Sequence, residues 1–272
     1  MTDGRTGTFK KITSLSNPLV KEIRALQLKK HRDESGLFIA EGQKLVRDAV
    51  DGGWRVEMLA YSATVGGDDV IGALAAETKA SGGAVLEVSA QVLEKITRRE
   101  NPQSVIGVFK QRYASETSIG AEGVWVALDR VRDPGNLGTI LRTADAASIR
   151  GVALVGAHCD PFSLEAVRAT MGSIFHVPLV RTTEDGLIEQ AKHHRAGLVG
   201  THLTAAAIDY READYRAPLV LLMGNEQQGL TEKLAAACDP LVRIPMRGKA
   251  DSLNLAVSTG LMIYEAMRRD LR

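Results

Sequence analysis

The sequence predicts an α/β protein with two domains, the second of which is built around a parallel sheet. Three observations support this fold class. A chain of 272 residues is long enough for about two domains. Short apolar runs typical of strands alternate with segments of helical periodicity. In the second half these runs are almost continuously apolar, which is typical of strands buried on both faces of a parallel sheet.

The first half begins with a predicted helix. Asn17 can cap it, and Pro18 follows at the first helical position, where a missing N–H is tolerated. Leu19, Ile23 and Leu26 then recur at helical spacing. Beyond Gly36 strands and helices are expected in turn, with strands at 37–40, 56–62, 84–88 and 105–110 and helices at 43–50, 69–80 and 91–98.

Residues 112–121 are polar, small and non-periodic. We expect them to form a linker between a first domain, 1–111, and a second domain, 122–272. In the second domain one helix should follow the first strand, and another should end the chain at about 255–269. The strands of this domain are predicted at 124–128, 152–155, 198–201, 219–223 and 241–244.

The composition, with 44% hydrophobic and 25% charged residues, is that of a globular protein with ample material for a core. The 34 basic residues nearly balance the 33 acidic ones, which disfavours a uniformly basic nucleic-acid-binding domain. No apolar run reaches the roughly 18 residues of a membrane span, and the N-terminus lacks a secretory signal. Cys159 and Cys238 match no disulfide or zinc spacing. We therefore expect a cytoplasmic protein without a metal site.

Positive charge is concentrated in two stretches of the first domain. Residues 1–32 hold eight Lys and Arg against two acids, and residues 95–112 hold five against one. A charge run is most often a solvated face. Two basic stretches on either side of an acidic segment nevertheless make a nucleic-acid-binding face a serious alternative. The cations expected on that face are Lys10, Lys11, Lys21, Arg24, Lys29, Lys30, Arg32, Arg98 and Arg99.

Unusual loops follow two of the predicted strands of the second domain. Ligands of open parallel sheets bind beyond the carboxyl ends of the strands. The loop after residue 128 contains Asn136, which can cap the next helix, and Arg142 lies inside that helix. The loop after residue 223 begins with Gly224, which permits close approach of a ligand to the backbone, and continues to Glu226. These loops are candidates for a ligand site.

A third loop precedes the last helix and ends in Ser252 and Asn254. Either side chain can cap that helix, whose N-terminus attracts anions such as phosphate. Capping or ion pairing alone would explain each of these polar residues singly. The glycines of the three loops match neither the mononucleotide nor the dinucleotide fingerprint, so those two kinds of site are not predicted.

In order and spacing the three loops resemble the three motifs of the SpoU branch of the SPOUT methyltransferases. These are Asn136…Arg142-Thr-Ala, then Leu-Met-Gly-Asn-Glu226, then Ile-Pro-Met…Ser252-Leu-Asn254-Leu-Ala-Val. Members of that family transfer a methyl group from S-adenosylmethionine to a ribose 2′-hydroxyl of RNA. The resemblance covers about residues 122–270 and implies a trefoil knot and a homodimer formed through the catalytic domain. Gln227 departs from the pattern, which usually has Gly after the Glu.

Residues 10–110 resemble, more weakly, a ribosomal-protein-like RNA-binding domain that often precedes the catalytic domain in this family. A large substrate-binding domain of this kind favours 23S ribosomal RNA as the substrate. Two alternatives remain at this point: a transfer-RNA 2′-O-methyltransferase, or a catalytically inactive RNA-binding protein.

The resemblance also implies roles for individual residues. Arg142 would clamp a phosphate and stabilise the developing alkoxide, since a guanidinium does not readily release its proton. Glu226 would hold Arg142, Asn136 and Ser252 would position the ribose and phosphate, and Asn254 would order the cofactor side. The residues expected to bind S-adenosylmethionine are Thr201, Leu222, Gly224, Ile244, Met246 and Leu253.

Overall fold

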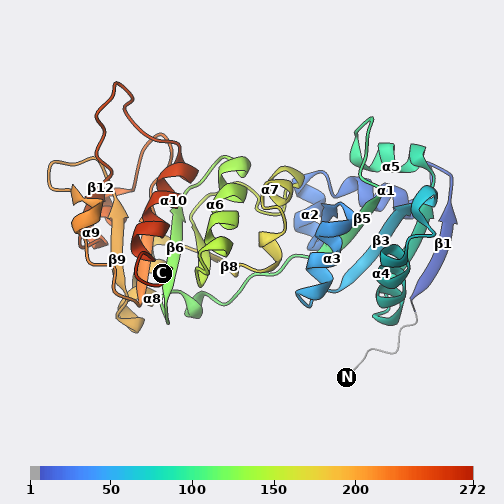
Figure 1. The fold of residues 1–272 in the computed structure, drawn as a ribbon, viewed down its shortest axis with the longest axis horizontal. Helices are drawn as coiled ribbons and strands as arrows, with labels where there is room; N and C mark the ends of the chain where they lie inside the picture. Colours follow the sequence, from blue (N-terminus) through green and yellow to red (C-terminus); the bar gives the residue numbers. More distant parts are fainter. Residues whose placement is uncertain (1–6, 272) are drawn as a thin grey trace. The chain divides into compact units, whose positions relative to one another are not determined.

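The computed structural model describes residues 7–271, which form two compact units (Figure 1). The first unit comprises the described residues up to Gln111 together with Phe162–Phe175. The second comprises Arg112–Pro161 and the described residues from His176 onward. The chain therefore contributes a segment from its second half to the first unit, which the sequence analysis did not predict. Arg5, part of the N-terminal basic stretch, lies outside the described residues.

The first unit is built on a mixed sheet. Its strand order is β1 (Thr8–Ile12), β4 (Ala84–Val88), β3 (Val56–Ser62), β5 (Val105–Lys110) and β2 (Leu37–Glu41). Strand β4 pairs in parallel with β1 and β3, whereas β5 is antiparallel to both β3 and β2. Strands β2 to β5 were predicted. Strand β1 was missed because its Lys-rich sequence has no apolar run.

Five helices of the first unit come from its N-terminal part: α1 (Pro18–Ala25), α2 (Lys29–Ser35), α3 (Gln43–Asp51), α4 (Asp69–Ala80) and α5 (Ala90–Thr97). Asn17 caps α1 as predicted, since its Oδ1 accepts the N–H of Leu19 at 3.0 Å. Helix α2 was not predicted. The chain leaves the helical conformation after Ala25 and Leu26, so the basic residues from Lys29 onward belong to this separate helix.

The inserted segment completes the core of the first unit. It forms α7 (Leu164–Ala169) and a 3₁₀ turn, η3 (Ser173–Phe175). The ring of Phe162 lies 4.7 Å from that of Phe38, and the ring of Phe175 lies 5.2 Å from that of Trp54. Trp54 also donates its indole N–H to the carbonyl of Phe175 at 2.9 Å. Aromatic side chains from both parts of the chain thus share one buried cluster.

The second unit is built on a seven-stranded sheet in which every ladder is parallel. The order is β10 (Ile208–Asp209), β12 (Leu241–Arg243), β9 (Gly197–Thr201), β11 (Leu219–Met223), β6 (Val124–Asp129), β7 (Gly151–Val155) and β8 (Leu179–Thr182). The predicted parallel α/β class is confirmed. The two edge strands, β10 and β8, are short and were missed.

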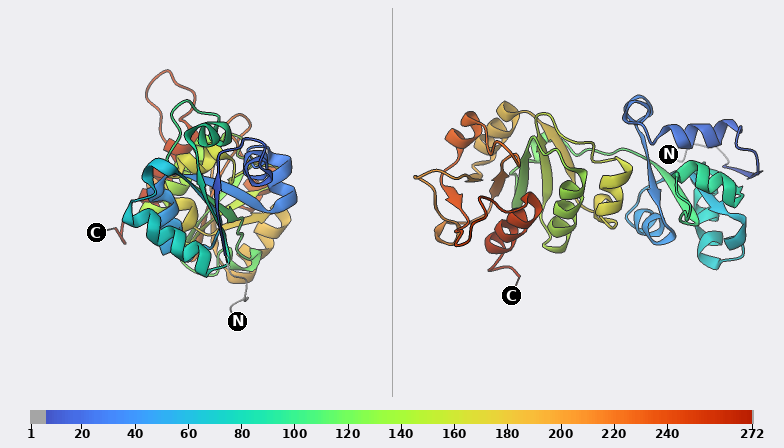
Figure 2. Two further views of the ribbon diagram at one scale, coloured as in Figure 1. Left: turned by 90° about the vertical axis from the view of Figure 1, so that its right-hand side faces the viewer. Right: turned by 90° about the horizontal axis from the view of Figure 1, so that it is seen from above.

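Helices cover both faces of this sheet, which explains the continuous apolar runs. Trp125 and Ala127 of β6 face α8 (Glu184–His194) and α9 (Glu232–Ala237). Residues that alternate with them point to the opposite face, which α6 (Pro134–Ala146) and α10 (Leu255–Ala266) cover (Figure 2). The trefoil knot stays a prediction. Within residues 7–271, no helix has the length and apolar character needed to span a bilayer.

Candidate functional site

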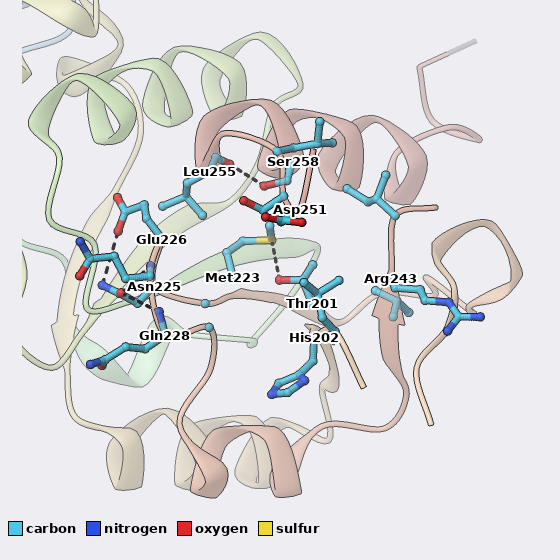
Figure 3. Close-up of a pocket in the computed structure, with 18 of the residues that line it drawn as sticks. Thr201, His202, Met223, Asn225, Glu226, Gln228, Arg243, Asp251, Leu255 and Ser258 are labelled. Carbon is cyan, nitrogen blue, oxygen red and sulfur yellow. Dashed lines mark hydrogen bonds between the residues drawn. The ribbon is translucent and has the colours of Figure 1, made fainter. Parts of the chain in front are cut away.

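A cavity of about 400 Å³ lies at the carboxyl ends of strands β9, β11 and β12 of the second unit (Figure 3). The loops after these strands form its walls, and Leu255 and Ser258 of α10 close one side. This is the edge at which a parallel sheet places its ligands, and the volume is in the usual range of a small-molecule site. Five residues predicted to bind the cofactor line the cavity: Thr201, Gly224, Ile244, Met246 and Leu253.

Leu222, the sixth residue predicted to bind the cofactor, does not line the cavity. It is fully buried in β11, one layer behind the wall. Its backbone carbonyl accepts a hydrogen bond from Oγ1 of Thr201 at 3.4 Å. Leu222 therefore contacts a residue of the cavity wall and is separated from the cavity itself.

The loop after β11 is closed by its own backbone. Asn225 and Gly229 exchange two N–H···O bonds of 3.0 and 2.9 Å. A Cβ on Gly224 would lie 2.4 Å from the carbonyl carbon of Gly229, so only glycine permits this closure. The left-handed position of the loop is Gly229, at φ +66°, and not the position of Gln227. The loop therefore does not require a glycine at Gln227 for a left-handed backbone.

Three of the predicted catalytic residues form one hydrogen-bonded chain. Nδ2 of Asn254 donates to Oδ1 of Asn136 at 2.9 Å, and Nδ2 of Asn136 donates to Oε1 of Glu226 at 3.4 Å. All three side chains line a second pocket of about 320 Å³, together with Arg132, Asp133 and Gln227. Glu226 and Gln227 also line the 400 Å³ cavity, so the two spaces meet at this loop.

The side-chain amide of Asn136 is available for this chain of bonds because another residue caps α6. The expectation that Asn136 itself caps α6 was wrong: Oδ1 of Asp133 accepts the N–H of Asn136 at 2.6 Å, and Asn136 lies inside the helix. At α10 the predicted cap is confirmed for Asn254, whose Oδ1 accepts the N–H groups of Ala256 and Val257 at 2.9 and 3.3 Å. Asn254 thus caps one helix and contacts another through the same amide.

Arg142 lies apart from these residues. Six positions along α6 place it about 9 Å from Asn136 along the axis and about 120° around the helix. Its side chain is exposed. The expected pairing of Arg142 with Glu226 is not present in the described structure, where Glu226 accepts hydrogen bonds from Asn136 and Asn225. Ser252 is also exposed and lines the 400 Å³ cavity, but not the second pocket.

The surroundings of the site suppress thiol chemistry. Burial, with the negative charges of Asp133 and Glu226, raises the pKa of Cys159 to about 12. Because the thiolate is the reactive form, this raised pKa disfavours reaction of Cys159 at neutral pH. Over residues 7–271, no cluster of three or more His, Cys, Asp and Glu side chains is arranged to hold a metal ion.

The structure adds wall residues that the sequence analysis did not single out: Arg132, His202, Leu203, Asp251 and Ser258. His202 follows Thr201, Asp251 precedes Ser252, and Ser258 lies one helical turn beyond Asn254. Nothing in the pattern distinguished them from ordinary loop residues. Nδ1 of His202 is buried without a hydrogen-bond partner in the described structure.

The cations predicted to bind nucleic acid lie on several elements of the first unit. Lys10 and Lys11 are exposed on the edge strand β1, and Arg98 and Arg99 are exposed after α5. Arg32 differs from this expectation. It is only 4% exposed, and its guanidinium donates to the carbonyl of Leu26 at 2.7 Å, which supports the connection between α1 and α2.

A parallel α/β unit with a cavity at the carboxyl ends of its strands defines an α/β protein with a small-molecule site. Residues 123–264 match the model of the SpoU rRNA Methylase family, and residues 17–107 match that of the MRM3-like substrate binding domain. The chain belongs to the SpoU rRNA methylase family. The family predicted from the three motifs is thereby confirmed.

Relatives of known activity and structure extend this result. The 23S rRNA (guanosine(2553)-2′-O)-methyltransferase RlmP of Bacillus subtilis is 32% identical over 94% of this chain and 98% of its own. The AdoMet-bound rRNA methyltransferase from Sinorhizobium meliloti is 54% identical, with a TM-score of 0.90 over 96% of this chain and 98% of its own.

A third relative is the SpoU methyltransferase AviRb from Streptomyces viridochromogenes in complex with AdoMet. It is 28% identical, with a TM-score of 0.83 over 94% of this chain and 98% of its own. These findings confirm the predicted fold class, the enzyme class and the cofactor. The chain is an S-adenosylmethionine-dependent methyltransferase.

Proposed function

We propose that this protein transfers a methyl group from S-adenosylmethionine to a ribose 2′-hydroxyl in large-subunit ribosomal RNA, and that it acts in the cytoplasm. The observation that carries the proposal is the junction of two spaces at Glu226. A cavity suited to a small molecule meets a pocket lined by the hydrogen-bonded residues Asn136 and Asn254. The relatives described above support the choice of ribosomal RNA and of the ribose hydroxyl.

The 400 Å³ cavity fits the cofactor in size and in chemistry. Its wall combines apolar side chains, such as Ile244 and Leu253, with the backbone of the loop that begins at Gly224. Apolar walls with a few placed polar groups suit an adenosine moiety. Bound there, S-adenosylmethionine supplies an electrophilic methyl group on sulfur. We assign its binding to Thr201, Gly224, Ile244, Met246 and Leu253, with Leu222 supporting Thr201 from behind.

The pocket of Asn136, Glu226 and Asn254 would hold the ribose. Each carboxylate oxygen of Glu226 accepts one amide N–H, Oε1 from Asn136 and Oε2 from Asn225, and each has a second lone pair that could accept a hydrogen bond from a hydroxyl. Such a bond orients the hydroxyl oxygen toward the cofactor. Ser252, on the cofactor side, would position the adjoining phosphate. Proximity and orientation of the two reactants then supply much of the rate enhancement.

Arg142 keeps the proposed role of an electrostatic clamp. Its exposed guanidinium can bind a phosphate that extends beyond the pocket, and it stabilises negative charge as the hydroxyl loses its proton. The phosphate or water would accept that proton. The cations of the first unit would bind RNA further from the reacting ribose. Five of them form no ion pair with other described residues and are therefore available to phosphates: Lys10, Lys21, Arg24, Arg98 and Arg99.

The direct test is methyl transfer in vitro from labelled S-adenosylmethionine to ribosomal RNA and to transfer RNA, followed by nucleoside analysis. We expect label in large-subunit ribosomal RNA as a single 2′-O-methyl nucleoside. Asn136→Ala should reduce the label at least about 100-fold, because it removes the centre of the hydrogen-bonded chain. Label in a base or in transfer RNA would contradict the proposed substrate. Absence of label with every RNA would favour an RNA-binding protein.

A second prediction concerns the proposed homodimer. Helix α10 exposes Val257, Leu261 and Tyr264 at 53%, 39% and 51%, an apolar face that a second copy would cover. The same helix packs on α6, where Gly260 faces Thr143, the neighbour of Arg142. Light scattering should give twice the chain mass of 29.3 kDa for the natural protein and the monomer mass for Leu261→Lys.

The matched control is Leu15→Lys, which changes a similarly exposed leucine (42%) in the first unit. This variant should remain a dimer. A natural protein that is monomeric at micromolar concentration would contradict the proposed dimer.

A further inference from the structure

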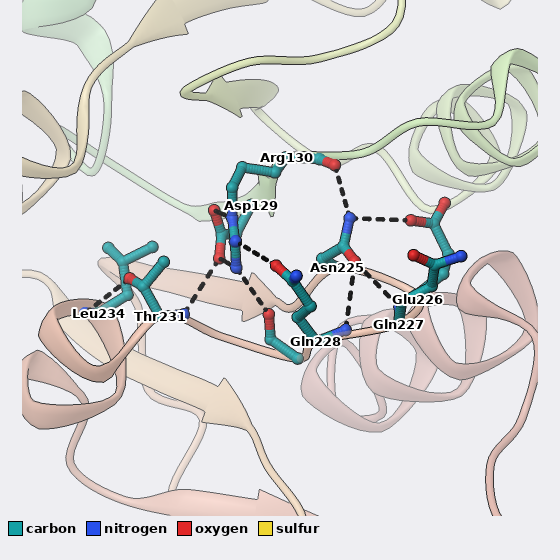
Figure 4. A network of polar contacts seen from close by, with 9 residues as sticks. Asp129, Arg130, Asn225, Glu226, Gln227, Gln228, Thr231 and Leu234 are labelled. Atoms are coloured by element: carbon teal, nitrogen blue, oxygen red, sulfur yellow. Dashed lines mark hydrogen bonds and ion pairs between the residues drawn. The ribbon is translucent and has the colours of Figure 1, made fainter.

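The loop at residues 225–229 contributes to the walls of both the 400 Å³ cavity and the pocket of Asn136, Glu226 and Asn254, and Arg130 is hydrogen-bonded to this loop (Figure 4). Nη1 of Arg130 donates to Oε1 of Gln228 at 2.8 Å, and Nη2 donates to the carbonyl of Gly229 at 3.1 Å. The backbone carbonyl of Arg130 accepts a bond from Nδ2 of Asn225 at 2.9 Å. One residue therefore contacts the loop at three places, and it lines neither of the two spaces.

Asp129 orients this arginine. Its carboxylate, 1% exposed at the end of β6, accepts Nε and Nη2 of Arg130 at 2.9 and 3.0 Å. The same carboxylate accepts the N–H of Thr231 at 3.2 Å, just beyond the loop. A bidentate guanidinium–carboxylate pair is rigid in direction as well as strong. Because Asp129 belongs to a central strand, the pair fixes the loop to the middle of the sheet.

Arg130 has a backbone conformation that glycine would also adopt. Its φ of +51° lies in the left-handed region, which residues other than glycine adopt rarely and glycine adopts readily. A glycine would therefore suit the turn better. The contacts that glycine would lose are those of the guanidinium with the loop and with Asp129.

We propose that Arg130, oriented by Asp129, is a positioning residue that sets the affinity for S-adenosylmethionine by fixing the 225–229 loop against β6. This inference rests on the proposed function, which places the cofactor in the 400 Å³ cavity. The backbone of that loop forms one wall of the cavity. A loop released from Arg130 spends less time in the conformation that completes the wall, and the apparent affinity falls by the same factor.

The test uses the full chain and calorimetric titration with S-adenosylmethionine. Arg130→Gly removes the guanidinium and relieves the left-handed backbone, so the fold should persist. It also leaves Asp129 buried without its cation, and the double variant Asp129→Asn, Arg130→Gly removes that charge as well. We expect the Kd for the cofactor to rise about tenfold in both variants. With saturating cofactor, kcat should stay within about twofold.

The matched control is Arg195→Gly. Arg195 also has a left-handed backbone, at φ +53°, but lies after α8 at the amino end of β9, away from the cavity. Its substitution should leave the Kd for the cofactor unchanged. Arg130→Lys should give an intermediate Kd, since one ammonium group can pair with Asp129 without reproducing the fork to Gln228 and Gly229.

Hydrogen exchange distinguishes positioning from a general structural role. In Arg130→Gly the amides of 225–229 should exchange faster, while those of β6 and β11 keep their protection. Natural-protein affinity in both Arg130→Gly and the double variant would overturn the inference. If the natural protein itself does not bind S-adenosylmethionine, the proposed function fails first, so the two failures are distinguishable.

Discussion

Arg142→Ala is expected to lower methyl transfer by about 10²–10³-fold or more and to leave the affinity for S-adenosylmethionine unchanged. The reason is where the side chain lies. Arg142 is exposed on α6, and its side chain does not line the cofactor cavity. Its guanidinium can stabilise charge that develops on the substrate without contributing to cofactor binding. Single-turnover rates and calorimetric titration of the cofactor measure the two quantities separately.

The control for this substitution is Arg150→Ala. Arg150 is likewise an exposed arginine of the second unit, but it pairs with Glu122 and its N–H bonds to Val124 at the opposite end of β6. Its loss should change neither the rate nor the affinity. If Arg142→Ala abolished cofactor binding, the clamp would be the wrong role, and the residue would belong to the cofactor site.

Arg142→Lys separates a clamp from a general base. A lysine retains the positive charge without the planar fork, so a clamp should keep part of the rate, with a pH dependence like that of the natural enzyme. A base should instead yield a rate that rises with pH toward the lysine pKa, about 10.4 in a model peptide. A profile of the second kind would assign the proton transfer to this position.

The elements that the sequence predicted are those whose burial leaves a repeating signal. Strands such as β11 (Leu219–Met223) are buried on both faces, so every position is apolar. The edge strand β10 has two residues, and β1 is basic, so neither carries that signal. The residues of the inserted α7 favour a helix, but the sequence does not indicate which of the two sheets that helix covers. Only the assembled core determines that choice.

The candidate site was predictable where a motif fixes local geometry and not where two groups compete. Parallel strands bring their carboxyl ends to one edge, so Asn136, Glu226 and Asn254 were expected together, and they are bonded in the structure. The cap of α6 was assigned to Asn136 because it follows a turn. Asp133 takes that place because its carboxylate reaches the N–H of Asn136. Asn136 contacts Glu226, and Arg142 lies about 9 Å further along α6 and about 120° around it, so it does not pair with Glu226.

A fragment of residues 1–111 is expected to lack a cooperative fold, although its boundaries match a domain predicted from the sequence. The five-stranded sheet of the first unit would lose Phe162 and Phe175 from its aromatic cluster. Burial of each such side chain contributes about 1.5–3 kcal/mol. The fragment should show weak near-ultraviolet circular dichroism and should bind a hydrophobic dye.

The fragment would also lose an ion pair, which makes its loss of stability larger than the lost packing alone would. Glu41, whose side chain is 2% exposed, accepts Nε and Nη2 of Arg168 at 3.1 and 2.5 Å. Removing the arginine leaves a buried carboxylate without its cation, which costs about 3–5 kcal/mol. Together with the aromatic losses, this is comparable to the whole stability of a small domain, about 5–15 kcal/mol.

For comparison, a second fragment contains the inserted segment as well: residues 1–111 are joined to 160–177 through a flexible Gly/Ser linker. This fragment should unfold cooperatively. Arg168→Ala in it should lower the free energy of unfolding by several kcal/mol, and Glu41→Gln combined with Arg168→Ala should recover part of that loss, because the uncompensated charge is then gone. A cooperative transition for 1–111 alone would show that the insertion is dispensable to the core. The expected result would instead mean that the chain between β7 and β8 is required by the first unit, so that the two units cannot be separated by a single cut after residue 111.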